Sequence, residues 1–168
     1  SLKAKKPNYI KKVVSEFLLF KWLRDQMGFS FLKSAATGGA ALGPDTFKFF
    51  VDMGIPLRQL YGQTEQLGAY TIHRENEVDY DTVGIPFKGV EVDIYEPDNE
   101  GLGEIVVKNK NCMKGYYGVS EDKVSISPDE WFHTGDAGYF DKAGHLVVID
   151  RVSDLSFTSE KLRYSPQY

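Results

Sequence analysis

Residues 55–65 have the sequence IPLRQLYGQTE, in which a short apolar run is followed by a glycine, a hydroxyl and a carboxylate. The run over residues 55–61 predicts a strand, and Gly62 predicts the turn that ends it. Polar side chains just beyond a strand are typical of an open α/β sheet, whose ligands bind outside the carboxyl ends of the strands. The stretch therefore favours an α/β fold. It makes Thr64 and Glu65 candidate ligand contacts, although on the pattern alone an ordinary polar loop with Glu65 in water is the simpler interpretation.

The residues before this stretch predict the rest of an α/β unit. Apolar residues recur at helical spacing over residues 7–27 and predict a helix that ends at Gly28 and packs a broad apolar face against a large surface. A short apolar segment over residues 29–36 predicts a buried strand, and residues 45–53 predict a second helix. Strand, helix and strand in this order favour a parallel sheet.

The pattern changes at about residue 69, where short alternating segments separated by turn residues begin. We predict an antiparallel sheet or small barrel from strands over residues 69–73, 90–95, 103–107, 138–140 and 145–149. The chain is accordingly divided into an α/β lobe over residues 1–75, a β-rich lobe over residues 76–149 and a polar final segment over residues 150–168.

Composition excludes several classes of protein. With 20 basic and 24 acidic residues, the net charge of −4 predicts no broad basic surface and no nucleic-acid partner. The lysines over residues 3–12 are a candidate phosphate or membrane-surface patch, although a solvated helix face is the simpler interpretation. A peripheral membrane contact therefore stays open, but no stretch approaches the roughly 20 apolar residues of a membrane span. Cys112 is the single cysteine, so we expect no internal disulfide and a cytoplasmic location.

Three other short motifs could contact a ligand. The glycines of TGGAA, residues 37–41, would let the backbone approach a flat molecule closely. In WFHTGD, residues 131–136, Asp136 follows a glycine turn and could accept hydrogen bonds from a ribose diol. Arg151, after an apolar strand, could bind a ribose or phosphate oxygen. Taken singly, these motifs are more typical of a plain turn, a turn-capping aspartate and a surface salt bridge.

The order and spacing of the motifs are more specific. YGQTE at residues 61–65 resembles the YGxTE signature of the adenylating superfamily, which includes acyl-CoA synthetases, peptide-synthetase adenylation domains and luciferases. GGAAL at residues 38–42 is similar to its GGAPL loop, with Ala41 in place of proline. Further blocks resemble VGxP…GVEV, GEIxV…MxGYY, WFxTGD and the [GD]R hinge, in family order over about residues 34–168.

The resemblance implies the C-terminal part of the large N-terminal domain of an adenylating enzyme. Such enzymes join a carboxylate to the α-phosphate of ATP, release pyrophosphate, and transfer the acyl group from the adenylate to the thiol of CoA. The implied cofactors are ATP, Mg²⁺ and CoA. By position, the resemblance implies a nucleotide site built from Gly38, Gly39, Ala40, Tyr61, Gly62, Gln63, Thr64, Asp136, Val148 and Arg151. Thr64 and Glu65 would be catalytic, with Glu65 on Mg²⁺, and Asp150 would be the hinge.

The resemblance also implies parts that this sequence does not contain. We expect the phosphate-binding loop upstream and the C-terminal domain with its lysine downstream, and hence an inactive isolated chain. The run TSEKLR at residues 158–163 departs from the family's glycine pair, which leaves the CoA contacts open. YGQTE, DRVSD and SPQY together resemble long-chain acyl-CoA synthetases, so the expected substrate is a fatty acid. An adenylation domain that loads a carrier protein and a non-catalytic binding module are the alternatives, and the oligomeric state stays open.

Overall fold

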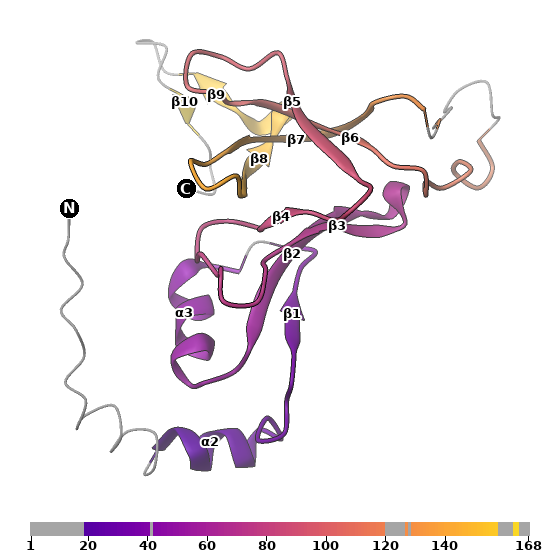
Figure 1. Cartoon of the computed structure of the whole chain (residues 1–168). Coiled ribbons are helices and arrows are strands. Elements are labelled where there is room, and N and C mark those ends of the chain that lie inside the picture. Colours follow the sequence, from indigo (N-terminus) through magenta and orange to yellow (C-terminus); the bar gives the residue numbers. More distant parts are fainter. Residues whose placement is uncertain (1–18, 41, 120–126, 128, 158–162, 165–168) are drawn as a thin grey trace.

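The computed structural model describes residues 19–40, 42–119, 127, 129–157 and 163–164 of the chain. Two four-stranded sheets lie next to each other, in the strand orders β1-β2-β3-β4 and β5-β6-β7-β8 (Figure 1). The first contains β1 (Ala35–Thr37), β2 (Leu57–Gln63), β3 (Gly68–Ile72) and β4 (Ile85–Pro86). The second contains β5 (Glu91–Tyr95), β6 (Gly103–Lys108), β7 (Phe132–Phe140) and β8 (Leu146–Arg151).

The first sheet is mixed. β1 and β2 are parallel and are connected by the helix α3 (Pro44–Asp52), as the strand–helix–strand order predicts. β2, β3 and β4 are antiparallel, because only the short 3₁₀ turn η2 (Thr64–Gln66) separates β2 from β3. A parallel pair would need a longer crossover. The α/β class is therefore confirmed, while the parallel arrangement is limited to one pair of strands.

The segment before β1 differs from its prediction. The helix α2 (Lys21–Gln26) ends just before Gly28, which has a positive φ of 74°, in line with the prediction. It has no buried residue, however, and Trp22 is 58% exposed. Residues 7–18 of the predicted helix lie outside the described residues. The predicted strand over residues 29–36 is wrong except at its end, because the Phe29 amide donates to the Arg24 carbonyl and keeps the chain folded against the end of α2.

The second sheet is antiparallel, as predicted, but the predicted strand over residues 69–73 is not part of it and pairs with β2 and β4 in the first sheet as β3. In addition, β7 begins earlier than the predicted strand at residue 138. Residues 132–136 were expected in a glycine turn; they lie within β7, where the chain bulges. Ile105 of β6 lies opposite residues 134–136, and Gly135 has a φ of 73°. The final segment, for which no element was predicted, contains the 3₁₀ turn η4 (Val152–Asp154) and a two-stranded sheet of β9 (Ser156–Phe157) and β10 (Arg163–Tyr164).

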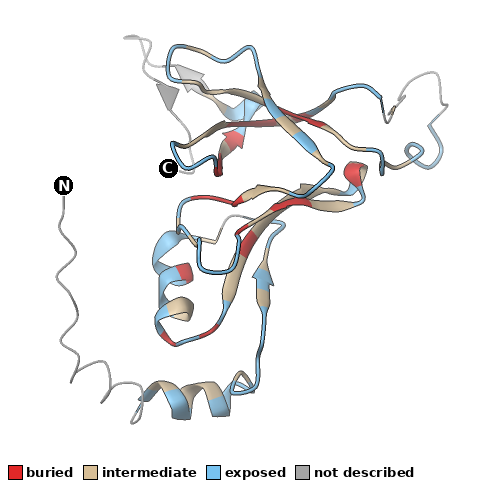
Figure 2. Ribbon diagram, in the orientation of Figure 1, coloured by how far each residue is buried: buried red, intermediate tan, exposed pale blue. Residues whose placement is uncertain are grey.

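A shared core joins the two sheets. Tyr70 and Val83 from the first part pack with Ile105, Val107 and Leu146 of the second sheet (Figure 2 shows the buried segments facing one another). Main-chain hydrogen bonds also cross: the Val83 amide donates to the Leu146 carbonyl at 2.8 Å, and the Leu146 amide donates to the carbonyl of Gly84 at 2.7 Å. Because β4 extends the first sheet beyond residue 75, the chain passes from the first sheet to the second between β4 and β5. The division into lobes itself stays a prediction.

A buried chain of polar side chains runs beside this core. The main-chain N–H of Gln59 donates to His73 Nδ1 at 3.0 Å, so the ring proton of neutral His73 is on Nε2, which lies 2.8 Å from Thr82 Oγ1. The Thr82 hydroxyl is 3.2 Å from Nδ1 of His145 and can donate to it. Burial, and next the neighbouring His145, lower the pKa of His73 to about 4. The folded chain therefore holds His73 neutral.

This histidine predicts acid sensitivity. Unfolded, His73 has an ordinary pKa of 6.5, so below that pH the unfolded chain binds a proton that the folded chain takes up only near pH 4. We expect the free energy of unfolding to fall as the pH drops from 6.5, by ~2 kcal/mol at pH 5. Urea unfolding at pH 7 and pH 5 measures this change. The variant His133→Gln, which changes an exposed histidine, is the control and should show the same fall in the free energy of unfolding between pH 7 and pH 5. Equal stability of the wild type at both pH values would contradict the role of His73.

The described part of the chain contains no helix that is both long and apolar enough to cross a bilayer.

Candidate functional site

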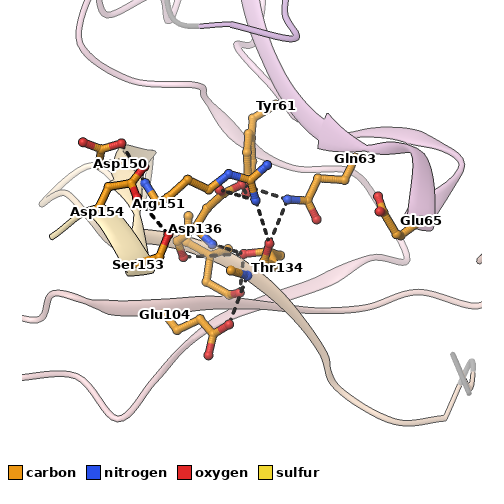
Figure 3. A network of polar contacts seen from close by, with 12 residues as sticks. Tyr61, Gln63, Glu65, Glu104, Thr134, Asp136, Asp150, Arg151, Ser153 and Asp154 are labelled. Carbon is orange, nitrogen blue, oxygen red and sulfur yellow. Dashed lines mark hydrogen bonds and ion pairs between the residues drawn. The ribbon is translucent and has the colours of Figure 1, made fainter. Parts of the chain in front are cut away.

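The carboxyl end of β2 directs two polar side chains toward the second sheet (Figure 3). Tyr61 and Gln63 are two positions apart along the strand, so their side chains point to the same face. Tyr61 Oη donates to Asp136 Oδ2 at 2.5 Å, and Gln63 Nε2 donates to the same oxygen at 2.9 Å. Gln63 Nε2 also donates to the Thr134 carbonyl at 2.9 Å. The YGQTE motif and the TGD motif are thus in direct contact.

The bulge in β7 fixes the position of Asp136. Thr134 Oγ1 donates to the Ile105 carbonyl at 2.7 Å and accepts from the Asp136 amide at 3.1 Å. The Gly135 amide donates to Glu104 Oε1 at 3.0 Å. These bonds satisfy the backbone groups that the bulge removes from the sheet ladder. Asp136 is held rigidly in this arrangement, and the residue is 8% exposed.

Arg151 completes the set at the end of β8, directly across the ladder from Asp136. Its Nη1 is 3.1 Å from Asp136 Oδ1 and donates to the Thr134 carbonyl at 3.3 Å. The Arg151 side chain is 58% exposed, so it forms the outer side of the site. Burial, with the nearby Tyr70 and Asp136, raises the pKa of Tyr61 far above its usual value, so its hydroxyl remains a proton donor.

A cavity of about 240 Å³ lies at this junction. Most predicted nucleotide residues line it: Gly39, Ala40, Tyr61, Gly62, Gln63, Asp136, Val148 and Arg151, together with the predicted hinge Asp150. Gly38 is not among the lining residues; it packs against Leu60, whose side chain a Cβ at this position would meet at 2.2 Å. The structure therefore gathers residues from motifs that are far apart in the sequence.

Thr64 and Glu65 line a neighbouring hollow, whose other walls include His133 and Gly135. The two spaces share Gly39, Gly62 and Arg151 among their lining residues, so one extended ligand could enter both. A hydrogen bond from Tyr116 lowers the pKa of Glu65, which stays ionised at neutral pH. Among the described residues, no cluster of three or more His, Cys, Asp or Glu could hold a metal. One carboxylate suits Mg²⁺ that is bound mainly by nucleotide phosphates and water.

Sequence reasoning missed several residues of the cavity. Gln59 is 6% exposed, and its Oε1 has no hydrogen-bond partner within the described structure. It precedes Tyr61 by two positions, so the alternation along β2 could have identified it. No such signal marks the remaining unpredicted lining residues, which come mainly from connections between elements: Leu42, Pro44, Leu60, Tyr80, Asp81, Val83 and Ile149.

A glycine-lined cavity with a carboxylate and an arginine at its wall is typical of nucleotide-binding sites. The family model described as AMP-binding enzyme matches residues 5–117, and the chain belongs to that family. The long-chain-fatty-acid–CoA ligase ACSBG2 of Xenopus laevis is 34% identical over 155 residues, which cover 91% of this chain and 21% of that protein. The 2-succinylbenzoate–CoA ligase of Staphylococcus epidermidis is 33% identical over 140 residues, covering 80% and 29%.

A solved structure agrees with these relatives. The o-succinylbenzoate CoA synthetase MenE of Bacillus subtilis, in complex with its acyl-adenylate intermediate OSB-AMP, matches with a TM-score of 0.68 and 29% identity. The match covers 80% of this chain and 29% of that one. The chain thus spans less than a third of the length of these relatives, which act on different acids by their names.

Proposed function

We propose that this chain is the nucleotide-holding part of an ATP-dependent, AMP-forming fatty-acid–CoA ligase. The observation that carries the proposal is the Asp136 carboxylate, held by Tyr61, Gln63 and Arg151 at the wall of the cavity. A carboxylate so placed can accept hydrogen bonds from both hydroxyls of a ribose. The neighbouring hollow, with Thr64 and Glu65, is suited to the phosphates and their Mg²⁺.

In the proposed reaction, an oxygen of the substrate carboxylate attacks the α-phosphorus of ATP and pyrophosphate leaves. The thiol sulfur of CoA then attacks the acyl carbon, AMP departs, and a thioester forms. The residues of this chain would hold the nucleotide in place during both steps. Asp136 and Arg151 would bind the ribose, Tyr61 would lie along the adenine, and Asp150, at 7% exposure, would anchor the hinge.

A fatty acid is the proposed substrate, because the Xenopus laevis relative carries that activity in its name and matches 91% of this chain. The test is ATP–pyrophosphate exchange by the full-length polypeptide that contains this segment, with fatty acids, aromatic acids and 2-succinylbenzoate as substrates. Exchange driven by fatty acids supports the whole proposal. Exchange driven by another acid contradicts the substrate, and no exchange with any acid contradicts adenylation.

Gln59 supports a prediction about the base. Gln59 lines the cavity, and its buried Oε1, which has no partner within the described structure, is proposed to accept a hydrogen bond from the exocyclic amine of adenine. We expect Gln59→Leu to weaken ATP binding about tenfold, the effect of ~1.4 kcal/mol. The melting temperature should not fall, since the change also removes an unsatisfied buried group. Calorimetric titration with ATP and ITP checks this, because ITP lacks the amine. A variant that still prefers ATP as strongly as the wild type does would contradict the assignment.

A further inference from the structure

The connection between β6 and β7 reaches across to the first sheet and contacts one residue there twice. The Met113 amide donates to the main-chain carbonyl of Glu65 at 2.9 Å. Tyr116 Oη donates to Glu65 Oε1 at 2.5 Å. Residues 109–119 form no helix or strand, so these two bonds attach an irregular segment to the η2 turn. Glu65 is therefore positioned from the second sheet as well as by its own.

The side-chain bond has chemical consequences for the carboxylate. The phenol of Tyr116 donates to Oε1 of Glu65 and so fixes the orientation of the carboxylate. Because Oε1 accepts the hydrogen bond from Tyr116, the other carboxylate oxygen, Oε2, can coordinate a cation. A glutamate fixed in this way has already lost the rotamer freedom that binding would otherwise remove.

The surroundings of the pair are suited to a metal–phosphate ligand. Tyr116 and Glu65 line the same hollow as Thr64, Gly135 and Arg151. This combination offers a hydroxyl, a backbone turn and a guanidinium for phosphate oxygens, together with one carboxylate for the cation. Tyr116 is 46% exposed, so its hydroxyl contributes little to a hydrophobic core. Its contact with Glu65 thus has a clearer role in the site than in folding.

We propose that Tyr116 is a positioning residue that holds the Glu65 carboxylate for the magnesium ion accompanying the nucleotide. The inference rests on the proposed function, and it adds a residue that acts on the metal through Glu65. It separates two properties of the site: nucleotide binding without metal should not depend on Tyr116, and metal binding to the nucleotide complex should.

The test compares Tyr116→Phe with Tyr117→Phe, which removes the same hydroxyl from a fully exposed neighbour. A non-hydrolysable ATP analogue is first titrated into the protein without metal, and its binding is monitored by NMR of the chain. Mn²⁺ is then titrated into the analogue complex and the free ion is measured by electron paramagnetic resonance. We expect equal metal-free binding in all three proteins. Mn²⁺ binding should weaken about five- to tenfold in Tyr116→Phe alone, the scale of one ordinary hydrogen bond.

Each outcome has one meaning. Mn²⁺ binding by Tyr116→Phe that equals or exceeds that of the wild type overturns the positioning role. So does an equal loss of analogue binding without metal, because that would show a general structural effect. Wild-type protein that binds no analogue overturns the proposed nucleotide site itself, and with it the inference that rests on it.

Discussion

Asp136→Ala in the full-length polypeptide is expected to reduce ATP–pyrophosphate exchange at least 100-fold. The carboxylate is proposed to accept hydrogen bonds from both ribose hydroxyls, and two bonds to a charged group together contribute ~3 kcal/mol or more. The same change leaves the Tyr61 hydroxyl without its acceptor and removes the ion pair with Arg151. A loss of stability could therefore accompany the loss of exchange, and the variants must separate the two effects.

Asp136→Asn provides this separation, because it retains the shape of the side chain and one carbonyl oxygen for Tyr61. We expect it to fold with a melting temperature near that of the wild type and still to lose most of the exchange. Asp93→Ala is the matched control, since Asp93 is an exposed aspartate on β5 of the same sheet. Exchange that survives in folded Asp136→Asn and Asp136→Ala would contradict the role of the carboxylate.

Gly84→Ala should have the largest effect on stability. Gly84 is buried at the junction of the two sheets with a φ of 77°, and an added Cβ would lie 2.1 Å from the carbonyl carbon of Ile72 and 2.2 Å from the amide nitrogen of His73. Both contacts are with backbone atoms, so no side-chain rotation can relieve them. We expect a loss of ~4 kcal/mol or more in the free energy of unfolding, which is among the largest effects of single substitutions.

Gly89→Ala is the natural control for this prediction. Gly89 also has a positive φ, of 87°, but nothing lies within 4 Å of an added Cβ. It should cost only the ~1–2 kcal/mol of the left-handed backbone conformation. Urea unfolding of both variants measures the difference. Equal losses would show that the close approach of the chains at Gly84 does not limit stability.

Local patterns in the sequence predicted most strands but not how the chain bends within them. A short apolar run identified β2, and short alternating segments identified β3, β5, β6 and β8, each to within a few residues. The bulge of β7 was mistaken for a turn, since a glycine with positive φ has the same signature in both settings. Residues 29–34 contain three large apolar side chains, Phe29, Phe31 and Leu32, but form no strand. Their composition alone could not distinguish a connecting segment from a buried strand.

The site illustrates a second limit. Tyr61 and Asp136 are 75 positions apart, and only the family resemblance placed them together before the structure did. The contact between Tyr116 and Glu65 was not predicted at all, because it joins an irregular segment to a turn and has no periodic signal. Gln59 is the exception, since its place on the same face of β2 as Tyr61 was available from the alternation.

The location of the site at the seam between the sheets couples ligand occupancy to the docking of those sheets. One half of the site, Tyr61 and Gln63, belongs to β2, and the other half, Asp136 and Arg151, belongs to β7 and β8. Any fluctuation that parts the sheets dismantles the site, and a ligand that spans the seam must oppose that fluctuation. A bound nucleotide would thus stabilise the contact between the two sheets, and its release would allow them to separate more often.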